Sequence, residues 1–228
     1  MTGMSNQSYL SVWLTDFTEE HMLEHFGDFL STVPYSAAKP GLTYLTIRAV
    51  DSSESPIYEQ DLRPVPLDPS GIVELATEYL HSDCAYEARA QWDLWIFDPA
   101  SEPAFRSEPE PLELICYGED YDSGAWQQNG HFEANLGFEH FFTGHAGLLG
   151  IDKSAPRAAE SPEEARFLEA MAWPENLEKY QEKTRENIRR LIEWVRHIEK
   201  AIPNGRVRLW SEGEENFEAR LEEILAAR

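Results

Sequence analysis

The chain has 228 residues, of which 42% are apolar and seven are Trp, enough to bury a sizeable core, so intrinsic disorder is excluded. No run of about 18 uninterrupted apolar residues occurs, so we expect no membrane-spanning helix. The formal net charge is −23, and a field of that sign repels nucleic acid and anionic membrane surfaces.

The N-terminal residues and the cysteines bear on where the protein works. Met1 to Gln7 lack the basic and apolar parts of a signal peptide. Cys84 and Cys116 are too few for a disulfide framework and fit a reducing compartment. We therefore expect a cytoplasmic protein in which both cysteines are small buried side chains.

The first 98 residues predict alternating strands and helices. Apolar residues recur at helical spacing from Met22 to Val33, and Pro34 ends that helix. The expected elements are a strand at 8–14, a helix opening within 15–20 and ending at Val33, strands at 41–50 and 57–62, a helix over 70–80 and a strand at 86–98. This order is typical of a ferredoxin-like α+β fold, with helices on one face of an antiparallel sheet.

Three runs with apolar residues on every second position predict a β-meander that extends this sheet. They are Tyr86–Asp98, Leu112–Tyr117 and Gly130–Phe138. The linkers between them, 99–111 and 117–129, are too polar for a core and too long for hairpin turns. We therefore interpret them as recognition loops carried by a rigid sheet.

The C-terminal part predicts helices. Residues 153–160 resemble a linker, and Ser161 to Glu164 form a capping box with Pro at the first helical position. A break at Trp173–Pro174 precedes a long helix to Ala201, whose apolar residues over 177–202 make a narrow seam. A strand at 207–210 and a last helix follow. We expect an acidic sheet domain at 1–152 and a helical segment at 153–228 packed on or beside it, or one domain overall.

The negative charge is concentrated in the sheet region. Residues 1–152 hold 26 Asp and Glu against 5 Lys and Arg, a net charge of −21, whereas residues 153–228 hold 16 against 14, a net charge of −2. Such a surface attracts a basic partner and speeds the encounter with it. The alternative interpretation is that the acidic residues serve solubility alone.

Two groups of residues suggest metal or acid/base chemistry. His21 to His25 match the H-x-x-E-H string of zinc peptidases, but the helical stripe places these histidines on the wet face, away from any dry cavity. A second group, spread over 15 residues, supports the alternative of a metal-dependent or acid/base enzyme. Its members are His131, Glu133, His140 and His145.

The alternation along the strand predicts which tryptophans are buried in the core and which lie on the other face. Trp92 is in phase with Leu94 and is expected in the core, while Trp95 points to the other face. Trp126, in a Gly-flanked acidic loop, is the aromatic residue that we assign to binding.

Motifs for nucleophilic catalysis and phosphate binding are absent from the sequence. The leading hypothesis is therefore a non-enzymatic binding protein without a cofactor, in concrete form an immunity-type inhibitor that masks the basic cleft of a toxin. A further alternative is a structural subunit that assembles through the 177–202 helix. The predicted partner-binding residues are Glu108, Glu110, Glu119, Asp120, Asp122, Trp126 and Trp95.

Overall fold

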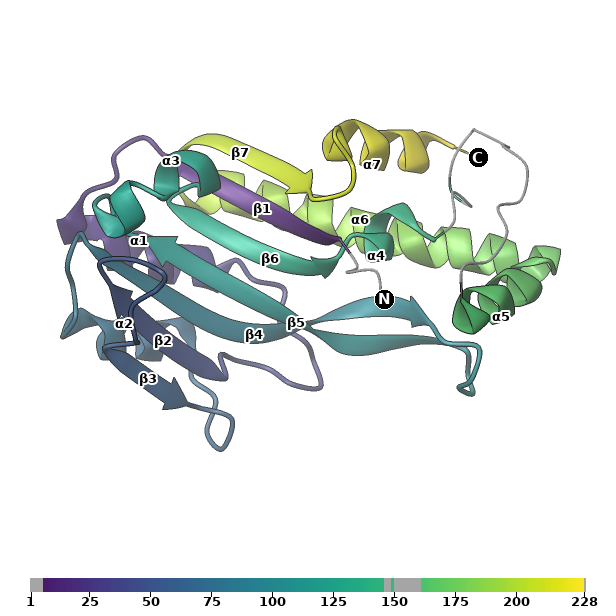
Figure 1. Ribbon diagram of the computed structural model, residues 1–228, viewed down its shortest axis with the longest axis horizontal. Coiled ribbons are helices and arrows are strands. Elements are labelled where there is room, and N and C mark those ends of the chain that lie inside the picture. The colour runs from purple at the N-terminus through teal and green to yellow at the C-terminus, as the bar shows by residue number, and fades with distance from the viewer. Residues whose placement is uncertain (1–5, 146–148, 150–160, 228) are drawn as a thin grey trace.

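Seven strands form one antiparallel sheet in the order β3-β2-β4-β5-β6-β1-β7 (Figure 1). The computed structural model describes residues 6–145, 149 and 161–227. The strands are β1 (Gln7–Leu14), β2 (Tyr44–Ala49), β3 (Tyr58–Asp61), β4 (Cys84–Phe97), β5 (Phe105–Tyr117), β6 (Phe132–Phe138) and β7 (Asn204–Ser211). The protein is thus an α+β protein, as the sequence predicts.

The longer helices cover one face of this sheet (Figure 1). The longest, α6, runs along that face. The helices are α1 (Glu19–Ser31), α2 (Pro69–Thr77), α3 (Trp126–Asn129), α4 (His140–Thr143), α5 (Pro162–Met171), α6 (Pro174–Ala201) and α7 (Phe217–Ala226), with a 3₁₀ turn η1 (Tyr121–Ser123). Among residues 6–145, 149 and 161–227, no helix combines the length and apolar character that a membrane span requires.

The main core lies between the sheet and these helices. Trp92 is fully buried there, as its phase predicts, and its ring packs edge-on against Trp194 of α6, with centroids 5.8 Å apart. The apolar stripe of α1 is buried in the same core, including Met22, Phe26 and Phe29. Alternation in the strands and helical spacing in the helices therefore converge on one face of the sheet.

The β-meander is confirmed, because β4, β5 and β6 are consecutive antiparallel neighbours. The ferredoxin-like arrangement is not confirmed. In such a sheet the first strand lies beside the strand that follows the second helix, whereas here β5 and β6 separate β1 from β4. The last strand of the meander, β6, pairs with one edge of β1, and β7 pairs with the other edge of β1.

The Pro-rich stretch 99–111 is mostly strand, not loop. β5 begins at Phe105 and pairs with β4 through Pro109 and Pro111. Among the described residues, β5 pairs with β6 only from Glu113 to Cys116, so its first half has β4 on one side alone. A proline is tolerated there, because its missing N–H lies on the open edge of the strand. This half of the hairpin extends beyond the sheet as an arm (Figure 1).

The helix α6 holds the arm. The side chain of Asn187, which is buried, accepts a hydrogen bond from the backbone N–H of Trp95 and donates one to its carbonyl oxygen, at 2.8 and 3.0 Å. Lys183 lies 3.8 Å from the centre of the Trp95 ring. Trp95 is therefore covered by α6 rather than presented on an open surface.

The C-terminal part shares the core of the sheet. The N-cap at Ser161 is confirmed, since its hydroxyl accepts from the backbone N–H of Glu164, and α6 begins at Pro174, within the predicted break. The seam residues Ile188, Leu191 and Ile198 are buried in the main core. The seam therefore packs against the sheet of its own chain, and these residues are not exposed for a helix of another chain. Residues 153–160, the expected linker, lie outside the described residues.

Candidate functional site

The face of the sheet opposite the main core carries three rows of side chains that run across the strands. The register of the strand pairs places His131, Glu133 and Asn135 of the β6 region in successive rows. The His131 row contains Arg206, Trp13, His131, Tyr117, Ala85 and Arg48; the Glu133 row contains Arg208, Ser11, Glu133, Ile115, Glu87 and Thr46; the Asn135 row contains Trp210, Tyr9, Asn135, Glu113, Arg89 and Tyr44.

Residues 118–130, here called the covering segment, fold back over the His131 row. The segment contains η1 and α3, and α3 lies against β1 and β6. Gly118 and Gly130 stand at its two ends, where backbones approach closely. A Cβ on Gly118 would collide with the carbonyl oxygen of Ser82, and one on Gly130 would lie 2.7 Å from the backbone nitrogen of Val12. Glycine is therefore required where the segment leaves and rejoins the sheet.

The covering segment buries His131. The imidazole lies between Phe17 and Trp126, which stack on it with centroid distances of 4.1 and 4.5 Å. As a result, His131 is only 4% exposed. Nδ1 accepts a hydrogen bond from the backbone N–H of Leu14 at 2.9 Å, so the neutral ring carries its proton on Nε2. Burial lowers the pKa of His131 to about 4.

Glu133 lies next to this histidine on β6 and is 8% exposed. The hydroxyl of Tyr117 donates to its Oε1 at 3.1 Å. Burial raises the pKa of Glu133 to about 7, although the Tyr117 hydrogen bond opposes that rise. The carboxyl group is consequently poised to exchange a proton near neutral pH. Because side chains alternate along a strand, His131 and Glu133 share one face of the β6 region, and the covering segment lies over the His131 end of that face.

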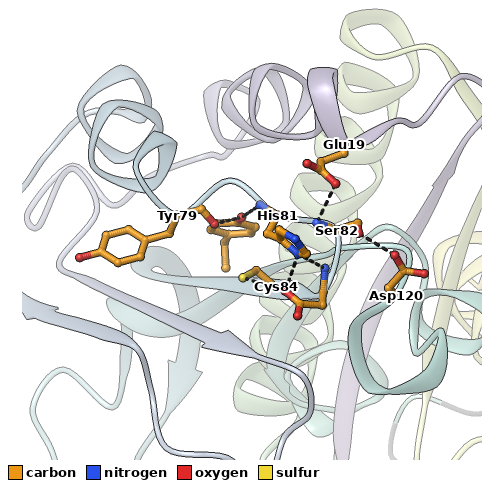
Figure 2. Close-up of polar contacts among 8 residues, drawn as sticks. Glu19, Tyr79, His81, Ser82, Cys84 and Asp120 are labelled. Carbon is orange, nitrogen blue, oxygen red and sulfur yellow. Dashed lines mark hydrogen bonds and ion pairs between the residues drawn. The ribbon is translucent and has the colours of Figure 1, made fainter.

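Hydrogen bonds join the covering segment to two neighbouring loops at one end of the sheet. Figure 2 shows the centre of this network, where the Ser82 hydroxyl donates to Asp120 at 2.6 Å and its backbone N–H donates to Glu19 at 3.1 Å. On the other side, Asp122 accepts from the Ser52 hydroxyl at 3.1 Å. The contacts tie the first turn of α1, the β2–β3 loop and the α2–β4 loop to the segment.

Acidic residues from four stretches of chain lie at this end of the sheet. We call the group the acidic end; it consists of Glu19, Asp51, Asp83, Glu119, Asp120 and Asp122. The carboxylates of Glu19, Asp120 and Asp122 take part in the network. Hydrogen bonds from Ser53 lower the pKa of Asp51, which keeps that carboxylate ionised. Three of the six were predicted from sequence as partner-binding residues, and the fold adds Glu19, Asp51 and Asp83 from distant positions.

A cleft of about 300 Å³ opens beside the acidic end, between the covering segment and strands β2, β4 and β5. Ile115, Tyr117 and Tyr121 supply its apolar surface, and Glu87 and Asp122 supply two carboxylates. Arg48 also lines it, with its guanidinium donating to the carbonyl oxygen of Glu54 at 2.9 Å. Glu87 is paired with Arg89 at 2.7 Å, so the acidic cleft offers aromatic faces together with the carboxylate of Asp122.

The other predicted partner-binding residues lie elsewhere. Glu108 and Glu110 are on the arm half of β5, far along the strand from the covering segment. Glu108 pairs with Arg106, and burial raises the pKa of Glu110. Trp126 belongs to the covering segment, but its ring stacks on His131. Its Nε1 donates to the carbonyl oxygen of Glu119 at 3.2 Å. The predicted surface is thus divided between the two ends of β5.

The four residues of the alternative enzyme hypothesis form two pairs. His131 and Glu133 lie at the start of β6, whereas His140 and His145 follow its end and stack on each other with centroids 4.0 Å apart. Burial and then the neighbouring His145 lower the pKa of His140 to about 3. Within the described ranges, no three His, Cys, Asp or Glu side chains gather closely enough to hold a metal ion.

The zinc-peptidase string and the cysteines remain. His21 is exposed on the wet face of α1, as predicted, whereas His25 is half-buried, and their ring centroids are 6.3 Å apart. Both cysteines are buried and unpaired. Burial raises the pKa of the Cys84 thiol to about 11, so it is not a thiolate nucleophile at neutral pH.

Comparison with known proteins adds no family to this description. No protein-family model matches the chain, and no curated protein or solved structure matches it either. The fold and the site therefore define only a class: an α+β protein with one helix-covered sheet face and one open face, across which a hydrogen-bonded segment is laid.

Proposed function

We propose that this chain is a non-enzymatic, cytoplasmic binding protein that captures a basic protein partner through the acidic end and the acidic cleft. In its most concrete form it is an immunity-type inhibitor that occupies the cationic active-site cleft of a toxin. The observation that carries the proposal is the placement of six acidic residues from four stretches of chain at one end of the sheet, where hydrogen bonds fix Asp120 and Asp122.

Preorganisation favours binding over simple solubility. Acids that serve only solubility need no fixed positions, whereas Asp120 and Asp122 are held by side-chain and backbone hydrogen bonds to neighbouring loops. A rigid set of like charges is costly to the isolated protein and is compensated when an opposite charge arrives. Fixing the charges in advance also lowers the ordering cost of association.

The acidic cleft suggests how the partner is held after the encounter. A Lys or Arg side chain has an apolar stem and a cationic head. Ile115, Tyr117 and Tyr121 match the stem, and Asp122 matches the head. We expect one basic side chain of the partner to insert there, while the acidic end contacts the surrounding positive surface.

A site-directed cross-linking experiment tests this proposal. A photoreactive amino acid replaces Glu119, which is exposed at the acidic end, and in a matched variant it replaces Glu199, which is exposed on α6. Both full-length variants are irradiated in an extract of the native host, and cross-linked proteins are identified by mass spectrometry. We expect position 119 to trap a basic protein that position 199 does not, in a yield that falls as salt is raised.

The outcome against the proposal is equally specific. If both positions trap the same proteins, or if the protein trapped at position 119 is acidic, the acidic end is not a capture surface. The variant Glu119→Gln, which removes one charge without adding bulk, provides a second measurement: it should weaken capture, whereas Glu199→Gln should leave capture unchanged.

A further inference from the structure

A second concave surface lies on the other side of the covering segment, and its chemistry is the opposite of that of the acidic cleft. This groove of about 420 Å³, here called the basic groove, is within the size range of small-molecule sites. β1 and β7 form one wall and α3 the other. Its lining residues are Trp13, Gln127, Gln128, Asn129, Arg206, Arg208 and Trp210.

The two arginines are held by aromatic rings and not by acids. The guanidinium of Arg206 lies 4.5 Å from the centre of the Trp13 ring, and that of Arg208 lies 5.9 Å from the centre of the Trp210 ring. The other support is Tyr9, which stacks on Trp210 at 4.3 Å. Neither guanidinium forms an ion pair with any residue that the structure describes. On a chain with a net charge of −23, two neighbouring arginines without an acidic partner form a local positive patch.

The ring contacts do not use the N–H groups of either arginine. A guanidinium that lies on an indole ring is oriented by it, and its N–H groups remain free for an oxyanion. Arg206 and Arg208 are two residues apart on one face of β7, about 7 Å by strand geometry. Flexible side chains at that spacing can donate to one tetrahedral oxyanion together, as guanidinium groups do at phosphate sites.

The opposite wall supplies neutral polar groups. Gln127 and Gln128 project from α3 and are exposed, and Asn129 lines both the basic groove and the acidic cleft. Amide side chains both donate and accept hydrogen bonds, so they suit the polar part of an organic ligand better than a second charge. The groove thus combines an anion-binding edge with an amide-rich wall.

We propose that the basic groove binds a small organic phosphate of about the size of a nucleoside monophosphate, with its phosphate on Arg206 and Arg208. The net charge of the protein decides between this ligand and a polyanion. A nucleic acid strand brings charges that extend beyond the screening distance of about 8 Å and meets the repulsion of the whole protein. A small dianion meets mainly the local field of the two arginines.

Titration calorimetry on the full-length protein tests the proposal with four probes: adenosine 5′-monophosphate, inorganic phosphate, adenosine and a ten-nucleotide single-stranded DNA. We expect the monophosphate to bind with a Kd below about 1 mM, more tightly than inorganic phosphate and than adenosine. Arg206→Gln and Arg208→Gln should each weaken that binding about tenfold or more. Arg196→Gln, at an exposed position on α6, is the matched control and should bind as the wild type does.

Each other outcome overturns the proposal. Absence of monophosphate binding, or binding that the Arg206 and Arg208 variants retain, would show that the groove is not a phosphate site. Equal affinity for inorganic phosphate and the monophosphate would show that the organic part is not recognised. Tighter binding of the DNA strand would assign the groove to single-stranded nucleic acid instead. Because the substituted arginines are exposed on an edge strand, unchanged circular dichroism is expected and verifies the fold of each variant.

Discussion

The two sides of the covering segment differ in charge although they share one sheet face. On the side of β2 and β4, Glu87 and Asp122 border a cleft at the acidic end. On the side of β1 and β7, Arg206 and Arg208 border a groove lined by tryptophans. The difference teaches that net charge is a poor guide to local recognition, since a chain at −23 still presents a basic aromatic surface.

The segment that separates the two surfaces offers the largest test. Gly118→Ala adds a methyl group that collides with the backbone of Ser82, and we expect it to lower the free energy of unfolding by about 2–3 kcal/mol, as overpacking does. Gly71→Ala is the control, because Gly71 lies in the helix α2 and its added Cβ meets the side chain of Leu67 at 3.3 Å and not backbone. Urea unfolding measures both. A smaller loss in Gly118→Ala than in Gly71→Ala would show that the segment is not anchored through Gly118.

The buried carboxyl under the segment gives the next prediction. Folded Glu133, with a pKa of about 7, retains a proton that the unfolded chain releases near pH 4.5, so its contribution to stability is lost as pH rises between these values. Glu133→Gln removes this loss. Relative to the wild type, the variant should gain about 3 kcal/mol between pH 4.5 and 8.

His131 works in the opposite direction over part of this range. Its pKa of about 4 in the folded state lies below the usual 6.5, so the fold gains stability as pH rises between these values in the wild type and the variant alike. The difference between the two proteins therefore isolates Glu133. Urea unfolding at several pH values measures it, with Glu113→Gln, a more exposed carboxylate on the same face, as the control. Equal pH dependence of the two variants would mean that Glu133 is not buried in solution.

Much of the fold follows from local patterns. Alternation predicts β4 and β6, the Ser161 box predicts the start of α5, and Pro174 and Pro203 bracket α6. Strand order does not follow, because pairing β1 with β6 and β7 joins residues more than a hundred positions apart. The assignment of Pro109 and Pro111 to a loop fails because only the sheet shows that their edge of β5 is open.

The site is predictable in part. The two-residue spacing of His131 and Glu133 shows in the sequence that they share one face of a strand. It does not show which segment covers that face. Gly118 and Gly130, which flank the segment, are the one sequence signal for its close approach to the sheet. The basic groove leaves no local signal, because Trp13 and Arg206 meet only through the pairing of β1 with β7.

Salt dependence sharpens the acidic side of the comparison. If the gathered carboxylates steer the partner, the association rate of the protein trapped at position 119 should fall about tenfold between about 50 and 500 mM salt, because screening shortens the range of the field. The dissociation rate should change less, since it depends on groups desolvated in the complex. Stopped-flow measurements give both rates. An association rate that is constant over this range would exclude steering.

A smaller effect concerns the ring that covers His131. Trp126→Ala removes one of its two stacking partners and admits water, so the pKa of His131 should rise from about 4 toward its ordinary value. NMR titration of the imidazole measures this shift. Trp173→Ala, which removes an exposed ring before α6, serves as the control. If His131 titrates alike in both variants, another group maintains its burial.

The most direct measurement is a crossed comparison of two variants and two ligands. The affinities of Glu119→Lys and Arg208→Gln are measured for the protein trapped at position 119 and for adenosine 5′-monophosphate. We predict that Glu119→Lys loses affinity for the protein and keeps it for the monophosphate, and that Arg208→Gln does the reverse. Loss of both ligands in either variant, with the fold intact, would contradict the account, because the two sides of the covering segment would then be one site.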